Sequence, residues 1–149
     1  MHRAWWIAGL GLVLACAGVQ NPKDDDLRVV VDRFLHDVRW QYTDTAAARV
    51  LPACSDEFQD ALDDAKDDLK VTGWEIRRAE PIPGDGVKIR LQISYYLLPS
   101  TVLKEETVEQ IWKQEDKKWF LQSQAGGPFE FPPKGCPPAA APEPANAQP

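Results

Sequence analysis

"VKIRLQISYYL" (residues 87–97) alternates apolar and polar side chains along most of its length. A period of two places successive side chains on opposite faces of an extended strand. One face is therefore expected to be buried and the other to meet water, which is typical of an antiparallel sheet that is covered on one side. The expected buried set is Val87, Ile89, Leu91, Ile93 and Tyr95.

Three further strands are predicted around this one. "GWEIRRAEPI" (73–82) precedes it across the turn signal "PGDG" (83–86). "ETVEQIWKQ" (106–114) and "KWFLQS" (118–123) follow, joined by a short polar turn. Runs of β-branched and aromatic residues bounded by glycine, proline and aspartate favour hairpin-linked strands. The sequence predicts a four-stranded antiparallel meander.

The residues before position 70 follow a helical period instead. Apolar side chains recur at spacings of three and four from about Asp26 to Tyr42, which predicts an amphipathic helix. A short helical piece is expected over residues 45–51, ending before Pro52, and a third helix begins at Ser55. Three N-terminal helices followed by four strands predict an α+β domain over residues 26–124. The apolar positions of the first helix are Leu27, Val30, Val31, Phe34, Leu35 and Val38.

The N-terminus has the layout of a secretory signal over residues 1–15, with Arg3 before an uncharged apolar run. Twelve apolar residues make about 18 Å of helix, which is short of a hydrocarbon core of about 30 Å. The junction Val13-Leu14-Ala15-Cys16 resembles the lipobox of bacterial lipoproteins. That resemblance implies that Cys16 becomes the lipid-bearing mature N-terminus, followed by a linker to residue 25. The alternatives are an ordinary signal peptide with an incidental cysteine, or a buried N-terminal helix.

The lipobox resemblance also implies a location in the cell envelope. A thioether-linked diacylglycerol together with an amide-linked chain such as palmitate would anchor the protein stably, because two or more acyl chains hold a protein on a bilayer. Ala17 stands where an aspartate would favour inner-membrane retention, which favours the periplasmic face of the outer membrane. A net charge of −6 disfavours nucleic acid as a partner.

The C-terminal residues 125–149 carry 8 prolines of the 13 in the chain. Proline lacks an amide donor and fixes φ, so this segment is expected to be an extended, disordered tail. It would serve as a spacer or as a ligand for an envelope partner, unless it is an unselected terminus. In an oxidising compartment a disulfide between Cys54 and Cys136 is predicted, with two free thiols as the alternative.

Residues 27–124 resemble the NTF2-like, or SnoaL-like, superfamily. The resemblance is carried by "FLHDVRWQYTDTAAARVL" (34–51), by the order of helices and strands, and by the closing hairpin "EQIWKQEDKKWFLQS" (109–123). It implies a cone in which a curved sheet wraps around the long first helix. It also implies a pocket at the open end of that cone.

Four aromatic residues are candidates for the mouth of such a pocket: Tyr42, Tyr95, Tyr96 and Trp112. Alternatively, they are aromatic residues of the core and its rim. Catalytic members of the superfamily place acidic or histidine groups inside the cone. Here His36 and Asp37 are expected on the solvated side of the first helix, where adjacent residues diverge by about 100°. No cofactor and no metal site are expected.

These observations favour a non-catalytic, lipid-anchored envelope protein whose NTF2-like domain binds a protein partner or an apolar ligand near the membrane face. Two alternatives stay open. One is a small enzyme of the SnoaL or ketosteroid-isomerase type with a pocket among the aromatic residues. The other is a structural accessory subunit of an envelope complex. An exposed apolar patch would favour partner binding, whereas a strongly perturbed ionisable residue deep in a cleft would favour an enzyme.

Overall fold

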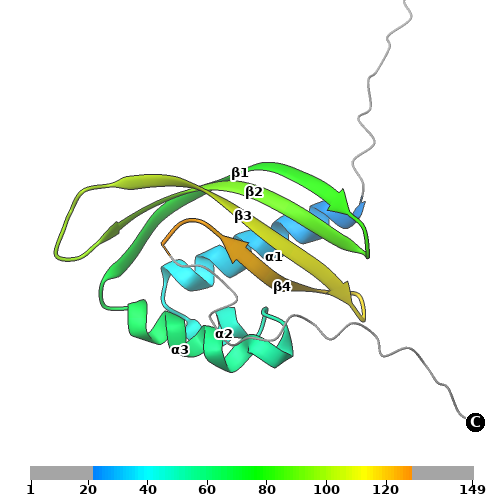
Figure 1. Cartoon of the computed structure of the whole chain (residues 1–149), viewed down its shortest axis with the longest axis horizontal. Coiled ribbons are helices and arrows are strands. Elements are labelled where there is room, and N and C mark those ends of the chain that lie inside the picture. Colours follow the sequence, from blue (N-terminus) through cyan, green and yellow to red (C-terminus); the bar gives the residue numbers. More distant parts are fainter. Residues whose placement is uncertain (1–21, 129–149) are drawn as a thin grey trace, which may run out of the picture.

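The computed structural model describes the backbone of residues 22–128 and the side chains of residues 26–128 (Figure 1). The predicted signal peptide, the predicted lipidation site Cys16 and Cys136 lie outside the described residues, as does the part of the predicted tail from residue 129 onwards. These expectations therefore stay predictions.

The described chain forms a helical region followed by an antiparallel sheet, so the predicted α+β class is confirmed. The helices are α1 (Pro22–Arg39), α2 (Thr43–Ala47), the short 3-10 helix η1 (Pro52–Cys54) and α3 (Ser55–Ala65). The strands are β1 (Leu69–Ile82), β2 (Gly86–Leu97), β3 (Lys104–Glu115) and β4 (Lys118–Ala125). They lie in the order β1-β2-β3-β4, each antiparallel to the next, as a meander requires.

Both ends of α1 differ from the prediction. The helix begins at Pro22 rather than Asp26, so the last four residues of the predicted linker are helical. Proline suits the first turn of a helix, because the amide that it lacks has no partner there. The helix ends at Arg39 rather than Tyr42, since Gln41 adopts a left-handed backbone with φ of 62°. A left-handed residue is a common way to terminate a helix.

The predicted faces of residues 87–97 are confirmed. The five expected apolar side chains are all buried, and each is at most 6% exposed. Arg90 lies on the opposite face and is exposed, while Lys88, Gln92 and Ser94 on that face are partly exposed. The first strand is longer than predicted and begins at Leu69, because Leu69 and Val71 continue the buried pattern.

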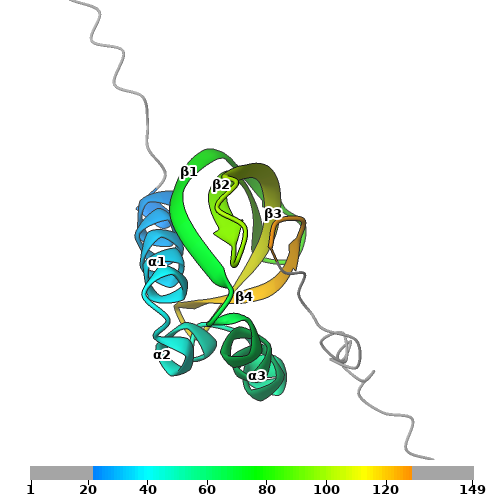
Figure 2. The same ribbon diagram turned by 90° about the vertical axis from the view of Figure 1, so that its left-hand side faces the viewer.

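The core lies between α1 and the apolar face of the sheet. Figure 2 shows the curved sheet with α1 along one side and with α2 and α3 below it. Phe34 of α1 lies at the centre of an aromatic cluster. Its ring centroid is 5.8 Å from that of Phe58 in α3 and 5.5 Å, edge to face, from that of Trp112 in β3.

The outer edge of β4 is partly covered by the segment between α2 and η1. Val50 forms a parallel bridge with Leu121. The amide of Leu51 donates to the carbonyl of Leu121 at 3.1 Å, and the amide of Leu121 donates to the carbonyl of Arg49 at 2.8 Å. This contact fixes Arg49 beside the final hairpin.

The domain also extends slightly beyond its predicted end at residue 124. Ala125 still belongs to β4, and two glycines follow it with φ of 81°. A Cβ atom on Gly126 would lie 2.7 Å from the carbonyl oxygen of Thr107, and one on Gly127 would lie 2.7 Å from Cγ2 of Val108. Glycine therefore permits these residues to lie closely against β3, a contact that residue-by-residue patterning did not reveal.

Candidate functional site

The four predicted pocket aromatics lie in different environments. Trp112 is fully buried in the core and Tyr95 is 3% exposed, whereas Tyr42 is 53% exposed. Tyr96 follows Tyr95 in β2, so it is directed to the opposite face of the sheet. Trp112 and Tyr95 thus match the alternative of core aromatics. The surface hollows described below are lined by other residues.

The apolar face of the sheet carries a buried polar chain that sequence reasoning missed. The indole nitrogen of Trp112 donates to Oε1 of Gln110 at 2.9 Å, and Nε2 of Gln110 donates to Oε1 of Gln124 at 2.8 Å. Gln110 is 0% exposed and Gln124 is 3% exposed. Buried amides need such partners, because an unmade hydrogen bond costs about 1–3 kcal/mol. These side chains fill space beneath the sheet.

Tyr95 also has a polar partner at its tip. Its hydroxyl donates to Oε1 of Glu106 on the neighbouring strand at 2.7 Å. Burial, the hydrogen bond to Glu106 and the negative charge of Glu106 together raise the pKa of Tyr95 to about 12, with burial as the largest cause. The phenol is therefore held in its neutral form.

This environment predicts a loss of stability at high pH. The pKa of Tyr95 lies above the usual value of 10 for tyrosine in the unfolded chain. Its contribution to stability is therefore fully present below pH 10 and is lost as the pH rises towards 12. We expect the free energy of unfolding to fall over this interval, by an amount on the order of 2 kcal/mol from Tyr95.

Chemical denaturation at successive pH values measures this effect, with tyrosinate absorbance followed in parallel. Tyr95→Phe should remove this part of the decline, while Tyr42→Phe, which changes an exposed ring, should keep it. An equal decline in wild-type and Tyr95→Phe protein would contradict the assigned role of the buried phenol.

Asp37 is buried, contrary to the expectation that it would be solvated. It is 5% exposed, because α2 packs on the end of α1 and the amide of Tyr42 donates to the carbonyl of Asp37 at 2.9 Å. The neighbouring His36 matches the expectation, with a side chain that is 53% exposed. Position on the helix alone did not reveal the burial, since the covering segment lies beyond the end of α1.

The carboxylate of Asp37 lies near His36 of α1 and near Arg49, which follows α2. Nδ1 of His36 lies 3.5 Å from Oδ1, and Nε of Arg49 lies 4.0 Å from Oδ2. Among the described residues, Oδ2 of Asp37 and Nε of Arg49 have no hydrogen-bond partner, although both atoms are buried. Asp37 and Arg49 therefore form a long ion pair, and each has one buried atom that makes no hydrogen bond in the described part of the chain.

Two surface hollows lie on either side of this pair. The first, the Arg49 hollow, has a volume of about 390 Å³ and lies between α1 and the β3–β4 turn. The second, of about 490 Å³, lies between α1 and β1 and includes the side chains of His36 and Asp37. Val29, which is 65% exposed, borders both. The Arg49 hollow is lined by Asp26, Val29, Val30, Ala48, Arg49, Lys117, Lys118, Trp119 and Phe120.

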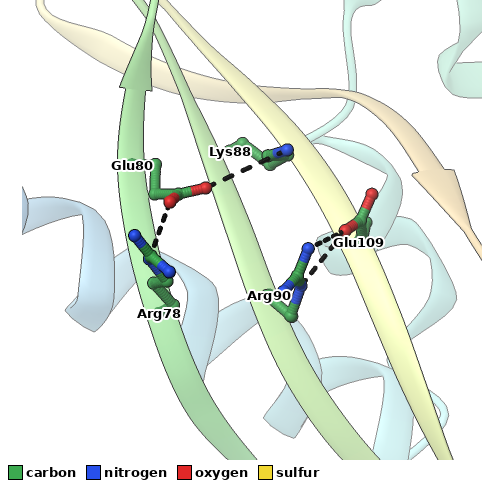
Figure 3. A network of polar contacts seen from close by, with 5 residues as sticks. All are labelled: Arg78, Glu80, Lys88, Arg90 and Glu109. Carbon is green, nitrogen blue, oxygen red and sulfur yellow. Dashed lines mark hydrogen bonds and ion pairs between the residues drawn. The ribbon is translucent and has the colours of Figure 1, made fainter.

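Charged side chains cover the outer face of the sheet in matched pairs (Figure 3). Glu80 accepts from Arg78 at 2.6 Å and lies 3.9 Å from Lys88, while Arg90 contacts Glu109 at 2.7 Å. The hydrogen bond with Arg90 is the main cause that lowers the pKa of Glu109, and the same bond raises the pKa of Arg90. Because these charges are mutually satisfied and exposed, the outer face has the character of a solvated surface.

Exposed apolar side chains gather instead at one end of the domain, here called the apolar end. The β2–β3 loop carries no charge from Leu97 to Leu103 and exposes four large apolar side chains. The end of α1 lies at the same end, since the turn after α3 bonds to both through Lys66 and Asp68. The apolar end consists of Trp40, Tyr42, Leu97, Leu98, Val102 and Leu103, which are 36–68% exposed.

Two further findings concern the described residues alone. Within residues 22–128 no helix has the length and apolar character needed to cross a membrane. No group of three or more histidine, cysteine, aspartate or glutamate side chains in this part of the chain could hold a metal ion. Cys54 is 4% exposed and disulfide-bonded, but the predicted partner Cys136 lies outside the described residues, so the pairing stays a prediction.

Comparison with known proteins adds a likeness of fold. No family model matches the chain, and no curated protein matches it. Among solved structures, the chain is similar to the solution structure of a SEC-C motif containing protein from Rhodopseudomonas palustris, with a TM-score of 0.55 and 7% sequence identity. The likeness covers 62% of this chain and 72% of the other. At this identity it concerns the fold alone.

Proposed function

We propose that this chain is a lipid-anchored protein of the cell envelope, of non-catalytic type, whose domain binds a protein partner through its apolar end. The anchor would be Cys16, and the location would be the periplasmic face of the outer membrane. The signal-like N-terminus and the lipobox junction support the anchor. The domain would follow the NTF2-like cone plan, which the curvature of the sheet beside α1 supports (Figure 2).

The observation that carries the binding role is the concentration of exposed apolar side chains at one end. Within the described residues, seven large apolar side chains are exposed, and six of them belong to the apolar end. Contiguous exposed apolar surface rimmed by polar residues is typical of interaction sites. The core beneath the sheet is occupied by Trp112 and Phe34, which favours binding at the surface over an enclosed apolar ligand.

The position of the apolar end favours a protein partner over the anchoring membrane. Figure 1 shows the start of α1 and the β2–β3 loop at opposite ends of the long axis. A lipid on Cys16 would leave only residues 17–21 before α1, a reach of at most about 18 Å for five extended residues. The apolar end would then be directed away from the anchored end and towards other envelope components.

Site-specific photocrosslinking in intact cells tests this proposal. A photoreactive residue at position 102, where Val102 is 68% exposed, should give a discrete protein adduct. The matched control is position 78 on the charged outer face, where the Arg78 side chain is 66% exposed and no adduct is expected. Equal adducts from both positions, or none from position 102, would argue against a partner at the apolar end.

The anchor is tested in the same cells. Cys16→Ser should leave the chain unprocessed or release it from the membrane fraction. The yield of the adduct from position 102 should then decrease, because the protein is no longer held beside its partner. Normal processing and unchanged membrane retention of Cys16→Ser would rule out the lipid anchor.

A further inference from the structure

From the Arg49 hollow we infer a second binding site, independent of the apolar end, for a small molecule with one carboxylate on an apolar chain. The first observation is an excess of positive charge in the lining of the hollow. The lining includes three cationic side chains, Arg49, Lys117 and Lys118, against the single carboxylate of Asp26. This excess is notable in a chain whose net charge is −6.

The second observation is a pair of buried donors that make no hydrogen bond to any described residue, although Arg49 forms the long ion pair with Asp37. The indole nitrogen of Trp119 and Nε of Arg49 are buried and make no hydrogen bond within the described residues. Trp119 is 8% exposed, and both side chains line the hollow. Native structures rarely leave buried donors without a hydrogen bond, so each such donor calls for an explanation. Both nitrogen atoms are covered, so a carboxylate seated between these two side chains would accept from them after a local shift of the lining.

The chemistry of the lining selects the ligand class. Val29, Val30 and Phe120 supply an apolar wall beside the donors. A planar guanidinium matches the two oxygens of a carboxylate. Because Arg49 is already paired with Asp37 at 4.0 Å, the remaining positive charge fits one negative charge better than two. A volume of about 390 Å³ admits a short acyl chain.

The structure also provides a variant that separates binding from folding. Lys117 lies in the tight β3–β4 turn, where Asp116 and Lys117 have φ of 47° and 64°. Glycine is the residue best suited to such a turn. Lys117→Gly therefore removes a cation from the hollow without straining the backbone. Weaker binding in this variant would then come from the lost charge and not from a disrupted domain.

Titration of the full chain with octanoate, followed by the indole N–H resonances, tests the inference. The chain has six tryptophans, and Trp119→Phe assigns the resonance of interest. Octanoate should move the Trp119 resonance saturably. Octanamide, which keeps the chain but lacks the charge, should bind at least about tenfold more weakly, since a hydrogen bond to a charged group is roughly twice as strong as one to a neutral group.

Variants complete the test. Lys118→Gln and Lys117→Gly should each weaken octanoate binding about threefold, as expected for a charge pair with an exposed lysine. Lys104→Gln, which removes the same charge at the far end of β3, should leave binding unchanged. A Trp119 resonance that octanoate does not move would overturn the site. Equal weakening by Lys104→Gln, or tighter binding of octyl phosphate or octanamide, would overturn the assignment to a carboxylate.

Discussion

Leu91→Asp should leave the domain unfolded. Leu91 is 0% exposed at the middle of β2, on the face that packs against the helical layer. A carboxylate at this position would be buried without a partner, at a cost of several kcal/mol. Because whole domains are stable by only about 5–15 kcal/mol, that cost removes much or all of the stability.

Circular dichroism with thermal unfolding measures this effect. Gln92→Asp is the matched control, because it places the same group one residue along β2 on the outer face, where Gln92 contacts Arg77 at 2.6 Å. The control should unfold close to the wild-type temperature. A Leu91→Asp protein with wild-type thermal stability would mean that the two faces of the strand are assigned the wrong way round.

Trp112→Ala should cost about 3–5 kcal/mol of unfolding free energy, the range found for large aromatic side chains cut to alanine in a core. The ring is fully buried and makes an edge-to-face contact with Phe34 at 5.5 Å. Its loss also removes the donor to Gln110, whose own amide continues to Gln124. The substitution therefore leaves both a cavity and a buried acceptor without its hydrogen bond.

Urea denaturation gives the change in unfolding free energy. Trp40→Ala removes the same side chain at a site that is 56% exposed, and it should cost less than about 1 kcal/mol. Trp112→Phe keeps most of the ring and removes the donor, so its cost should fall between the two alanine variants. Similar costs for Trp40→Ala and Trp112→Ala would contradict the central position of Trp112 in the core.

The strand faces and the apolar face of α1 were predictable because their periods are local. The alternation around Leu91 and the helical spacing around Phe34 each specify which side chains are buried, whatever lies opposite them. The interior environment of Tyr95 follows from the same alternation. The uncharged loop after Leu97 was also visible in the sequence, although only the structure shows that its apolar side chains remain exposed beside the end of α1.

The buried polar residues could not be predicted in this way. Asp37 is buried because a segment beyond the end of α1 covers it, and its partner Arg49 lies twelve positions later in the sequence. Gln110 occupies an inward-facing strand position where an apolar residue is expected, and it is tolerated because Trp112 and Gln124 satisfy its amide. Long-range pairing of this kind leaves no periodic signal in a single sequence.

The bridge between Val50 and Leu121 limits how copies of this chain can pair with one another at high concentration. A bare strand edge is a template for intermolecular pairing and aggregation. Here the backbone of residues 49–51 occupies part of the edge of β4. The opposite edge, β1, has irregular register at Val71/Gly73 and Ile76/Arg78 and contains Pro81, which cannot donate to a neighbouring strand. Neither edge thus offers a long regular ladder, and high local concentration should not drive these sheets to join into fibrils.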